Sequence, residues 1–404
     1  MRPQFLRRLL SLFTLCAILF PSVASADDWP QYRGPSLTGI STETDWSHDW
    51  GDAGPKRLWK QNVGVGLSGI VISDGRAYTI GNADDIDTVF CFDAATGKPI
   101  WKHDYEAATD PNEFDGGPTS TPTVNADHVF TISRGGEVYC FGKATGEVIW
   151  RVSAVELADV RTPGWGFAGS PLVIGDLLLL NVGDTGMALK KATGALAWSS
   201  GDKDAGYSSM VPTKVGGTSA VVFGSSRSYV CVDTQAGKLI WRQRWLTTFG
   251  CNAADPILSG DNIFISSGYN RGSALLKHAA DAPEVIWKNK DLQSQISSPV
   301  LIDGFLYGIH GDIDVGAELR CLELATGEVC WSGPKFKGGG LSAAGKRLVV
   351  LTGDGELLIV KANPKQSEIL ARHQVIQGKC WTPPVLSGGR IYCRSTDGEI
   401  VCLK

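Results

Sequence analysis

The stretch Phe90-Cys-Phe-Asp-Ala-Ala-Thr-Gly-Lys-Pro-Ile-Trp101 decides the fold of this chain of 404 residues, because the chain repeats it with the same internal spacing. Further copies end at Trp150, Trp198, Trp241 and Trp331. Each copy places a glycine between a strand that alternates apolar and polar residues and a strand that ends in tryptophan. Such self-similarity is typical of repeat architectures, in which one small structural unit is used many times.

Each copy is predicted to be a tight β-hairpin. Asp93 can accept hydrogen bonds from the backbone of the turn, and Gly97 supplies a backbone conformation that residues with a Cβ atom avoid. The second strand ends on Trp101, whose large flat side chain must be buried. One hairpin is too small to bury it, so we expect the indole to dock on the neighbouring repeat.

The period of the repeat indicates a propeller. Strand-ending tryptophans recur at intervals of roughly 40 to 50 residues, the length of a four-stranded propeller blade. The predicted docking residues are Trp59, Trp101, Trp150, Trp198, Trp241, Trp287 and Trp331. Ala371 takes the eighth place in this series, with the tryptophan lost.

The two ends of the repeat region predict how the ring closes. The last repeat supplies only three strands, at 385–387, 390–395 and 399–403, while residues 55–59 form a strand without a blade of its own. Joining them removes the unpaired sheet edges that invite aggregation. The sequence therefore predicts an all-β, eight-bladed β-propeller over residues 54–404, with four-stranded antiparallel blades and an N-terminal strand that completes the C-terminal blade.

The segment before the repeats has two parts. Residues 1–26 have the pattern of a cleaved Sec-type signal peptide, with early arginines, an apolar run and small residues at the cleavage site. The apolar run is too short for a good transmembrane helix, so we expect no membrane span and a periplasmic or secreted protein. Residues 27–53 are rich in tryptophan, glycine and aspartate, and we expect them to form a leader that packs on the propeller.

Charge excludes one class of partner. The formal net charge is −4, and removal of the signal segment with its three arginines makes the chain more acidic. No basic stripe remains to attract phosphate groups, so nucleic-acid binding is not expected. We expect a monomer.

The cysteines allow two interpretations. Several occupy one position of the repeat, where Ala188 stands in another copy, which is typical of a small, half-buried strand residue. If Asp397-Gly398 is a two-residue hairpin turn, however, Cys393 and Cys402 face each other across two strands. A disulfide between these two cysteines is therefore an alternative.

The repeat resembles the tryptophan-docking motif of the pyrroloquinoline-quinone (PQQ)-like repeat family, with matches at Asp93, Thr96, Gly97, Lys98 and Trp101. The resemblance implies an eight-bladed propeller and leaves two branches open. One comprises the quinoprotein dehydrogenases, in which PQQ lies between a tryptophan and a disulfide of adjacent cysteines, next to a calcium ion. The other comprises non-enzymatic scaffolds such as BamB, a lipoprotein of the outer-membrane β-barrel assembly machine.

The functional prediction follows the second branch, because this chain has no two adjacent cysteines. We expect an exported, non-enzymatic binding or scaffold protein that takes a protein or a polar ligand on one propeller face, with no catalytic residue, metal ligand or cofactor assigned. The alternatives are a PQQ- and calcium-dependent oxidoreductase with an atypical site, and a carbohydrate-binding module. Candidate ligand-face residues are Trp165, Ser170, Tyr207, Asn252, Asp255, Arg271, His310, Asp312, Trp381 and Arg394.

Overall fold

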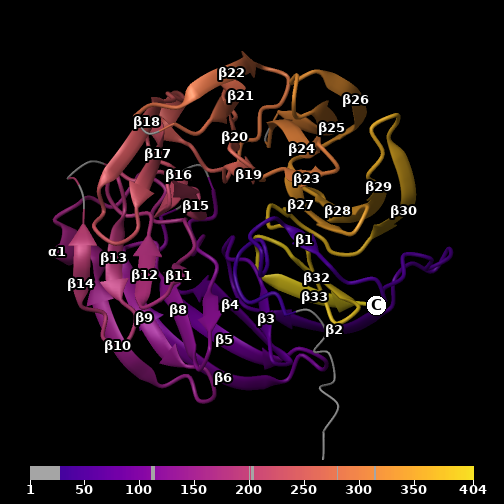
Figure 1. Ribbon diagram of the computed structural model, residues 1–404. Helices are drawn as coiled ribbons and strands as arrows, with labels where there is room; N and C mark the ends of the chain where they lie inside the picture. The colour runs from indigo at the N-terminus through magenta and orange to yellow at the C-terminus, as the bar shows by residue number, and fades with distance from the viewer. Residues whose placement is uncertain (1–27, 111–113, 200, 202–203, 280, 314) are drawn as a thin grey trace, which may run out of the picture.

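The structure is a computed structural model that describes residues 28–110, 114–199, 201, 204–279, 281–313 and 315–404. Its strands form eight sheets arranged around one central axis (Figure 1). Each sheet has four antiparallel strands, and one of them carries an additional short parallel strand. The predicted all-β, eight-bladed propeller is confirmed.

The blades follow one another along the chain, and in blades 1 to 7 the first strand is the innermost. Blade 1 contains β3 (Val71–Ser73), β4 (Arg76–Ala83), β5 (Ile86–Asp93) and β6 (Pro99–Glu106), and blade 2 contains β7 (Thr123–Asn125), β8 (His128–Ile132), β9 (Glu137–Gly142) and β10 (Val148–Ser153). Blade 3 contains β11 (Leu172–Ile174), β12 (Leu177–Leu180), β13 (Met187–Lys190) and β14 (Leu196–Ser199), and blade 4 contains β15 (Val211–Val215), β16 (Thr218–Gly224), β17 (Ser228–Asp233) and β18 (Leu239–Arg244). Blade 5 contains β19 (Ile257–Ser259), β20 (Asn262–Ser267), β21 (Gly272–Lys277) and β22 (Glu284–Asn289). Blade 6 contains β23 (Val300–Ile302), β24 (Phe305–Asp312), β25 (Gly316–Glu323) and β26 (Val329–Phe336). Blade 7 contains β27 (Gly339–Ala344), β28 (Arg347–Thr352), β29 (Glu356–Lys361) and β30 (Glu368–Gln374).

Blade 8 closes the ring with strands from both ends of the repeat region. It contains β31 (Val385–Ser387), β32 (Arg390–Arg394), β33 (Glu399–Leu403) and β2 (Arg57–Asn62). β2 pairs antiparallel with β33, with Trp59 opposite Cys402. The predicted closure of the C-terminal blade by an N-terminal strand is thus confirmed.

The strand-ending tryptophans reach from one blade to the next. The indole N–H of Trp101 donates to the carbonyl oxygen of Lys143 in blade 2 at 3.0 Å, and a Cβ atom at Gly146 would lie 2.5 Å from the indole. Only glycine therefore fits under the ring. Five further indole N–H groups make corresponding bonds to the carbonyl oxygens of Ala94, Lys191, Thr234, Leu324 and Asn363, and that of Trp241 donates instead to the ring Nδ1 atom of His278 at 3.4 Å.

The interface between blades 7 and 8 has no strand-ending tryptophan, because β30 of blade 7 carries Ala371 at the corresponding position. In blade 8 the two outermost strands, β33 and β2, are not joined by a turn, so there is no turn glycine on which an indole could lie. Trp46 and Trp50 of the leader pack in the same apolar cluster as Ala371. The leader thus covers the interface that lacks a strand-ending tryptophan.

The predicted facing of Cys393 and Cys402 is wrong. Cys402 lies opposite Tyr392, and Cys393 lies opposite Val401. The hairpin closes through Ser395 and Glu399, with Gly398 at φ +96°, so its loop is longer by one residue than the predicted turn and the register shifts. The two side chains therefore enter different core clusters, and all cysteines in the described part of the chain are free.

The leader crosses the central axis of the propeller. Trp29 pairs with Ile72 in blade 1, and β1 (Ile40–Ser41) lies parallel to β27 in blade 7 (Figure 1). Between them, the guanidinium of Arg33 donates to the carbonyl oxygen of Pro299 at 2.8 Å, next to blade 6. Residues 28–41 thus fill the inner part of the channel that the blades leave open.

The described residues contain one α-helix, α1 (Ala154–Ala158), and one 3-10 turn, η1 (Thr248–Gly250). In this part of the chain, no helix has the length and apolar character needed to span a membrane. The predicted signal peptide, residues 1–26, lies outside the described residues.

Candidate functional site

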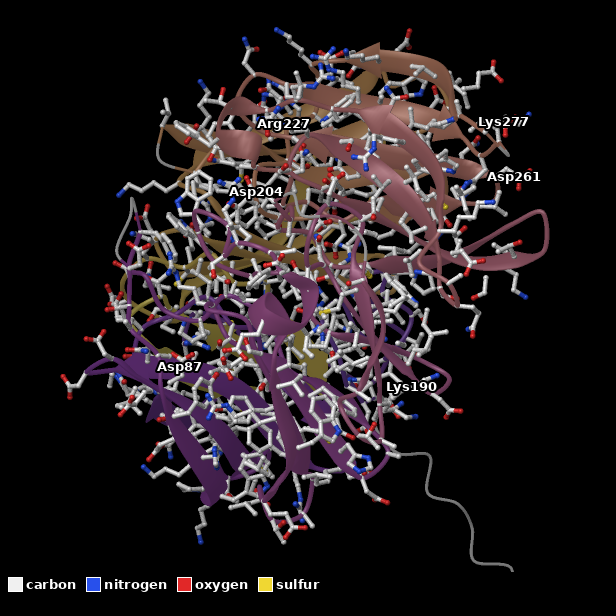
Figure 2. The ribbon with its side chains drawn as sticks, turned by 90° about the vertical axis from the view of Figure 1, so that its left-hand side faces the viewer. Asp87, Lys190, Asp204, Arg227, Asp261 and Lys277 are labelled. Carbon is white, nitrogen blue, oxygen red and sulfur yellow. The ribbon has the colours of Figure 1, made fainter. Side chains whose placement is uncertain are left out.

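The antiparallel blades place their connections alternately on two faces of the propeller. One face, here called the funnel face, carries the loops between blades and the turns between the second and third strands of each blade. Asp204 and Arg227 belong to this face, and Asp261 and Lys277 to the opposite one (Figure 2). The inter-blade loops of the funnel face surround the axis.

A cavity of about 200 Å³ lies on the axis among these loops. Its walls combine six aromatic residues with aliphatic and small ones, and its polar groups are mainly hydroxyls from serine and threonine. The lining includes Tyr32, Leu67, Phe114, Thr119, Thr121, Trp165, Ser170, Tyr207, Ser209, Cys251, Asp255, Tyr269, Gln295, Ile296, Ile313, Trp381 and Thr382. The cavity is smaller than the roughly 300–1,000 Å³ typical of sites for drug-sized ligands, so it suits one compact group.

Tyr32 of the leader separates this cavity from the rest of the channel. It lines both the large cavity and a second one of about 20 Å³ that lies between the leader and the innermost strands. The hydroxyl of Tyr32 is hydrogen-bonded to Ser298, and burial raises its pKa above the ordinary value. The leader therefore provides the floor of the large cavity.

The wall of the cavity is braced by hydrogen bonds that run from blade to blade. In five successive inter-blade loops, a backbone N–H just before the innermost strand donates to the side chain at the same place in the next blade. The successive bonds are Gly69 to Thr121 (2.8 Å), Thr121 to Ser170 (3.1 Å), Ser170 to Ser209 (3.1 Å), Ser209 to Asp255 (2.8 Å) and Asp255 to Ser298 (2.8 Å). We call this series the loop relay.

Asp255 is the exception in the loop relay. A hydroxyl oxygen accepts the bond at the other positions, yet here a carboxylate does so, although it is only 3% exposed. Burial raises the pKa of Asp255 to about 6, while the charge of Arg33 and the N–H of Ser209 act in the opposite direction. A buried carboxylate is costly where a serine would serve the structure, and perturbed carboxylates of this kind gather at functional sites.

The leader supplies the countercharge for Asp255. The Nε atom of Arg33 lies 3.9 Å from a carboxylate oxygen of Asp255, beyond hydrogen-bond distance. The guanidinium instead donates to the carbonyl oxygens of Leu37, Thr38 and Pro299. Burial lowers the pKa of Arg33, and Asp255 opposes that shift. The carboxylate is thus partly neutralised but retains capacity to accept hydrogen bonds from the cavity.

Aromatic rings connect the cavity lining with the surface of the funnel face, through Phe249, which lies outside the lining. Trp165 contacts both Tyr207 and Phe249 edge-on, with ring centroids 5.6 and 5.7 Å apart, and Phe249 contacts Tyr269 at 5.8 Å. Phe249 is 63% exposed and has a left-handed backbone, with φ +64°. We call these four residues the aromatic rim.

The cavity brings together Trp165, Ser170, Tyr207, Asp255 and Trp381 from the predicted ligand-face residues. The other candidates lie outside its lining. Asn252 is buried and ties blade 4 to blade 5, since it donates to the carbonyl oxygens of Ser225 and Trp245 and accepts a bond from Ser267.

Arg394 and Arg271 also lie outside the cavity lining. Arg394 is fully buried and donates to the carbonyl oxygens of Ser68 and Ile80, which braces blade 8 against blade 1. Burial lowers its pKa to about 9. The guanidinium of Arg271 lies 3.9 Å from the ring centroid of Trp245, a cation–π contact.

His310 and Asp312 belong to β24, beside the cavity. The Nδ1 atom of His310 accepts a bond from the backbone N–H of Gln293, and burial together with Arg320 lowers the pKa of His310. Asp312 ends the strand. Both residues lie outside the cavity lining.

The sequence reasoning missed several lining residues, notably Tyr32, Phe114 and Ile313, whereas it placed Tyr269 among the candidates on this face. Tyr32 and Phe114 come from segments without a repeat pattern, so no signal placed them at the axis. The loop relay did leave a signal, because its positions read Thr-Pro, Ser-Pro, Asp-Pro and Ser-Pro at 121, 170, 255 and 298. Comparing these positions singles out Asp255 as the acid among hydroxyls.

The lining does not fit PQQ with calcium. PQQ carries three carboxyl groups, yet the described residues that line the cavity include no Lys, Arg or His, and their acidic side chain is Asp255. Calcium takes six to eight oxygen ligands, whereas no cluster of three or more acidic, His or Cys side chains suited to a metal occurs among the described residues. Burial also raises the pKa of Cys251 to about 11, which keeps this lining thiol protonated.

Comparison with solved structures confirms the fold. BamB from Moraxella catarrhalis shares 15% sequence identity with a TM-score of 0.63, covering 86% of this chain and 97% of that one. Quinohemoprotein alcohol dehydrogenase from Comamonas testosteroni shares 14% identity with a TM-score of 0.65, covering 93% and 80%. A europium-containing methanol dehydrogenase shares 11% identity with a TM-score of 0.64, covering 91% and 90%.

These identities are low, so the structural likeness concerns the fold alone. No curated protein sequence matches the chain. A family model described as outer membrane protein assembly factor BamB, with PQQ repeats, matches residues 86–333, which is more than half of the chain. The chain therefore belongs to this BamB-like family of PQQ-repeat β-propellers.

Proposed function

We propose that this chain is an exported, non-enzymatic binding protein of the cell envelope that holds a partner polypeptide on its funnel face. The observation that carries the proposal is the aromatic rim at the mouth of the axial cavity. Phe249 is 63% exposed there and adopts a backbone conformation that residues with a side chain rarely take. An exposed, strained aromatic residue is costly for the free protein and useful when a partner covers it.

Two further observations support a binding role. The leader closes the inner end of the cavity through Tyr32, so a ligand can enter only from the funnel face. The family match is to an assembly factor, which is a protein that works by binding other proteins. The signal pattern in residues 1–26 supports action outside the cytoplasm.

The partner interaction is expected to depend on Phe249. Phe249→Ser should reduce capture of the partner from an envelope extract at least ten-fold while leaving the melting temperature nearly unchanged, because the side chain is mostly exposed. Val285→Ser is the matched control, since Val285 is 45% exposed on β22 at the outer edge of blade 5. Equal capture by both variants would contradict a role for the aromatic rim.

The poor fit of the cavity to PQQ leads to a second expectation. Addition of PQQ and calcium to the purified protein should produce neither a shift in quinone absorbance nor dye reduction with alcohols or sugars. The reason is that the cavity offers the cofactor carboxylates no cationic partner among its described lining residues. A saturable absorbance shift would instead favour an oxidoreductase.

A further inference from the structure

Building on the proposed function, we infer that the axial cavity receives one arginine side chain of the partner polypeptide, with Asp255 as the ionic anchor and the surrounding aromatic rings as the stacking walls. The charge, the aromatic residues and the hydrogen bonds of the cavity lining all favour a guanidinium group.

The charge of the cavity lining favours a cationic ligand. Among the described residues that line the cavity, Asp255 is the acid and no base is present. Arg33 lies outside the cavity lining, and its Nε and Nη2 atoms donate to carbonyl oxygens. A cationic group that enters from the funnel face therefore meets a complementary carboxylate in the wall.

The aromatic residues of the lining favour a guanidinium group over an ammonium group. Phe114, Trp165, Tyr207, Tyr269 and Trp381 line the cavity, and the ring of Trp381 already has the Nζ atom of Lys379 at 4.6 Å from its centroid. A guanidinium group stacks on aromatic faces and is more weakly hydrated than an ammonium group, so it enters such a site at lower cost. The fold already uses this contact elsewhere, where Arg271 lies over Trp245 at 3.9 Å.

The serine and threonine hydroxyls of the lining disfavour a sugar, because they already take part in hydrogen bonds within the protein. A carbohydrate needs many polar partners, but the hydroxyl oxygens of Thr121, Ser170 and Ser209 each already accept one backbone bond in the loop relay, so part of their hydrogen-bonding capacity is used. The hydroxyls of Thr119 and Thr382 donate to backbone carbonyl oxygens. The cavity is also small, at about 200 Å³. One side chain of a polypeptide suits it better than a sugar chain.

The test uses Nα-acetyl-arginine amide and its neutral isostere Nα-acetyl-citrulline amide, titrated into the full protein by isothermal calorimetry. We expect saturable binding of the arginine compound, at least ten-fold tighter than that of the citrulline compound. Asp255→Asn should weaken arginine binding at least ten-fold, because the amide keeps an acceptor for Ser209 N–H but removes the charge. Asp204→Asn is the control, since this exposed acid on the same face pairs with Arg161.

A second variant covers the case in which Asp255→Asn fails to fold because Arg33 loses its countercharge. Trp165→Leu leaves Asp255 and the loop relay intact and removes one stacking wall. It should weaken arginine binding about three-fold to ten-fold.

Arginine binding should also depend on pH. Burial raises the pKa of Asp255 to about 6, and the ligand needs the ionised carboxylate, so affinity should fall as the pH drops through about 6. The ionisable groups that face Asp255 are Arg33 and Tyr32 from the leader and Tyr229 from blade 4. Both tyrosines have raised pKa values and stay neutral, and Arg33 stays charged, so none of them titrates near pH 6.

The inference is overturned if the citrulline compound binds as tightly as the arginine compound, if neither binds, or if Asp255→Asn binds arginine as well as the native protein. Tighter binding of a methyl glucoside would make the cavity a carbohydrate site and would also overturn it. Such results leave the proposed function standing as long as partner capture still depends on Phe249. Loss of that dependence would refute the proposed function whatever the cavity binds.

Discussion

Deletion of residues 399–404 is expected to open the ring and cause the protein to aggregate. These residues include the whole of β33, which lies between β32 and β2 in blade 8. Val401, Cys402 and Leu403 are buried, and they contribute to core clusters on both faces of the blade. Without β33, the neighbouring strands present unpaired N–H and C=O groups at an open edge, which is a template for intermolecular pairing.

Size-exclusion chromatography with light scattering, together with thermal melting, measures this outcome. Deletion of Lys404 alone is the matched control, because it removes one exposed residue and leaves β33 complete. The longer deletion should give soluble aggregates or no folded protein, whereas the control should remain a monomer. A truncated chain that stays monomeric with an unchanged melting temperature would contradict the closed ring.

Trp101→Ala is expected to lower the free energy of unfolding by about 3–5 kcal/mol, the usual cost of truncating a buried tryptophan. The indole is 9% exposed and contacts the rings of Tyr78 and Phe141. Its N–H also bonds to Lys143 in the next blade, so the substitution removes packing and leaves a partly buried carbonyl oxygen with one partner fewer. Urea denaturation gives the measurement. Ile100→Ala, on the same strand and 43% exposed, is the control and should cost less than about 1 kcal/mol.

The contact between Trp101 and Gly146 can also be tested from the side of the neighbouring blade. Gly146 and Gly75 have similar left-handed backbones, at φ +74° and +71°, so substitution by alanine carries a similar backbone cost at both positions. A Cβ atom at Gly146 would lie 2.5 Å from the Trp101 indole, whereas one at Gly75 would meet nothing within 4 Å. Gly146→Ala should therefore be more destabilising by about 1–3 kcal/mol. Equal effects would mean that the indole does not press on this turn.

The architecture could be predicted from the sequence because it depends on a repeated local pattern. The turn glycines and the strand-ending tryptophans fix the hairpins and their spacing, and the incomplete last repeat indicates where the missing strand must come from. The register of the last hairpin could not be predicted in the same way. It depends on one additional loop residue before Glu399, a choice of turn that the period does not specify.

The site was only partly predictable, because it depends on contacts that the repeat does not specify. Positions in inter-blade loops, such as Trp165 and Asp255, could be assigned to one face from the topology alone. The path of the leader could not be assigned, since its course follows from long-range contacts of Trp29, Tyr32 and Arg33. Burial separated the remaining candidates, because Asn252 and Arg394 use their polar atoms to hold neighbouring blades together.

The composition of blade 8 has a consequence for biosynthesis. When the chain emerges from a ribosome or a translocation channel amino end first, β2 appears before every other strand of the four-stranded antiparallel blades, and its partner β33 appears after all of them. During this interval the edges of β2 have no partner in the nascent chain. The strand carries Arg57 and Lys60, and basic side chains discourage pairing with foreign strands. The native ring can therefore be completed only after β33 has emerged, and until then β2 remains open to other binding partners.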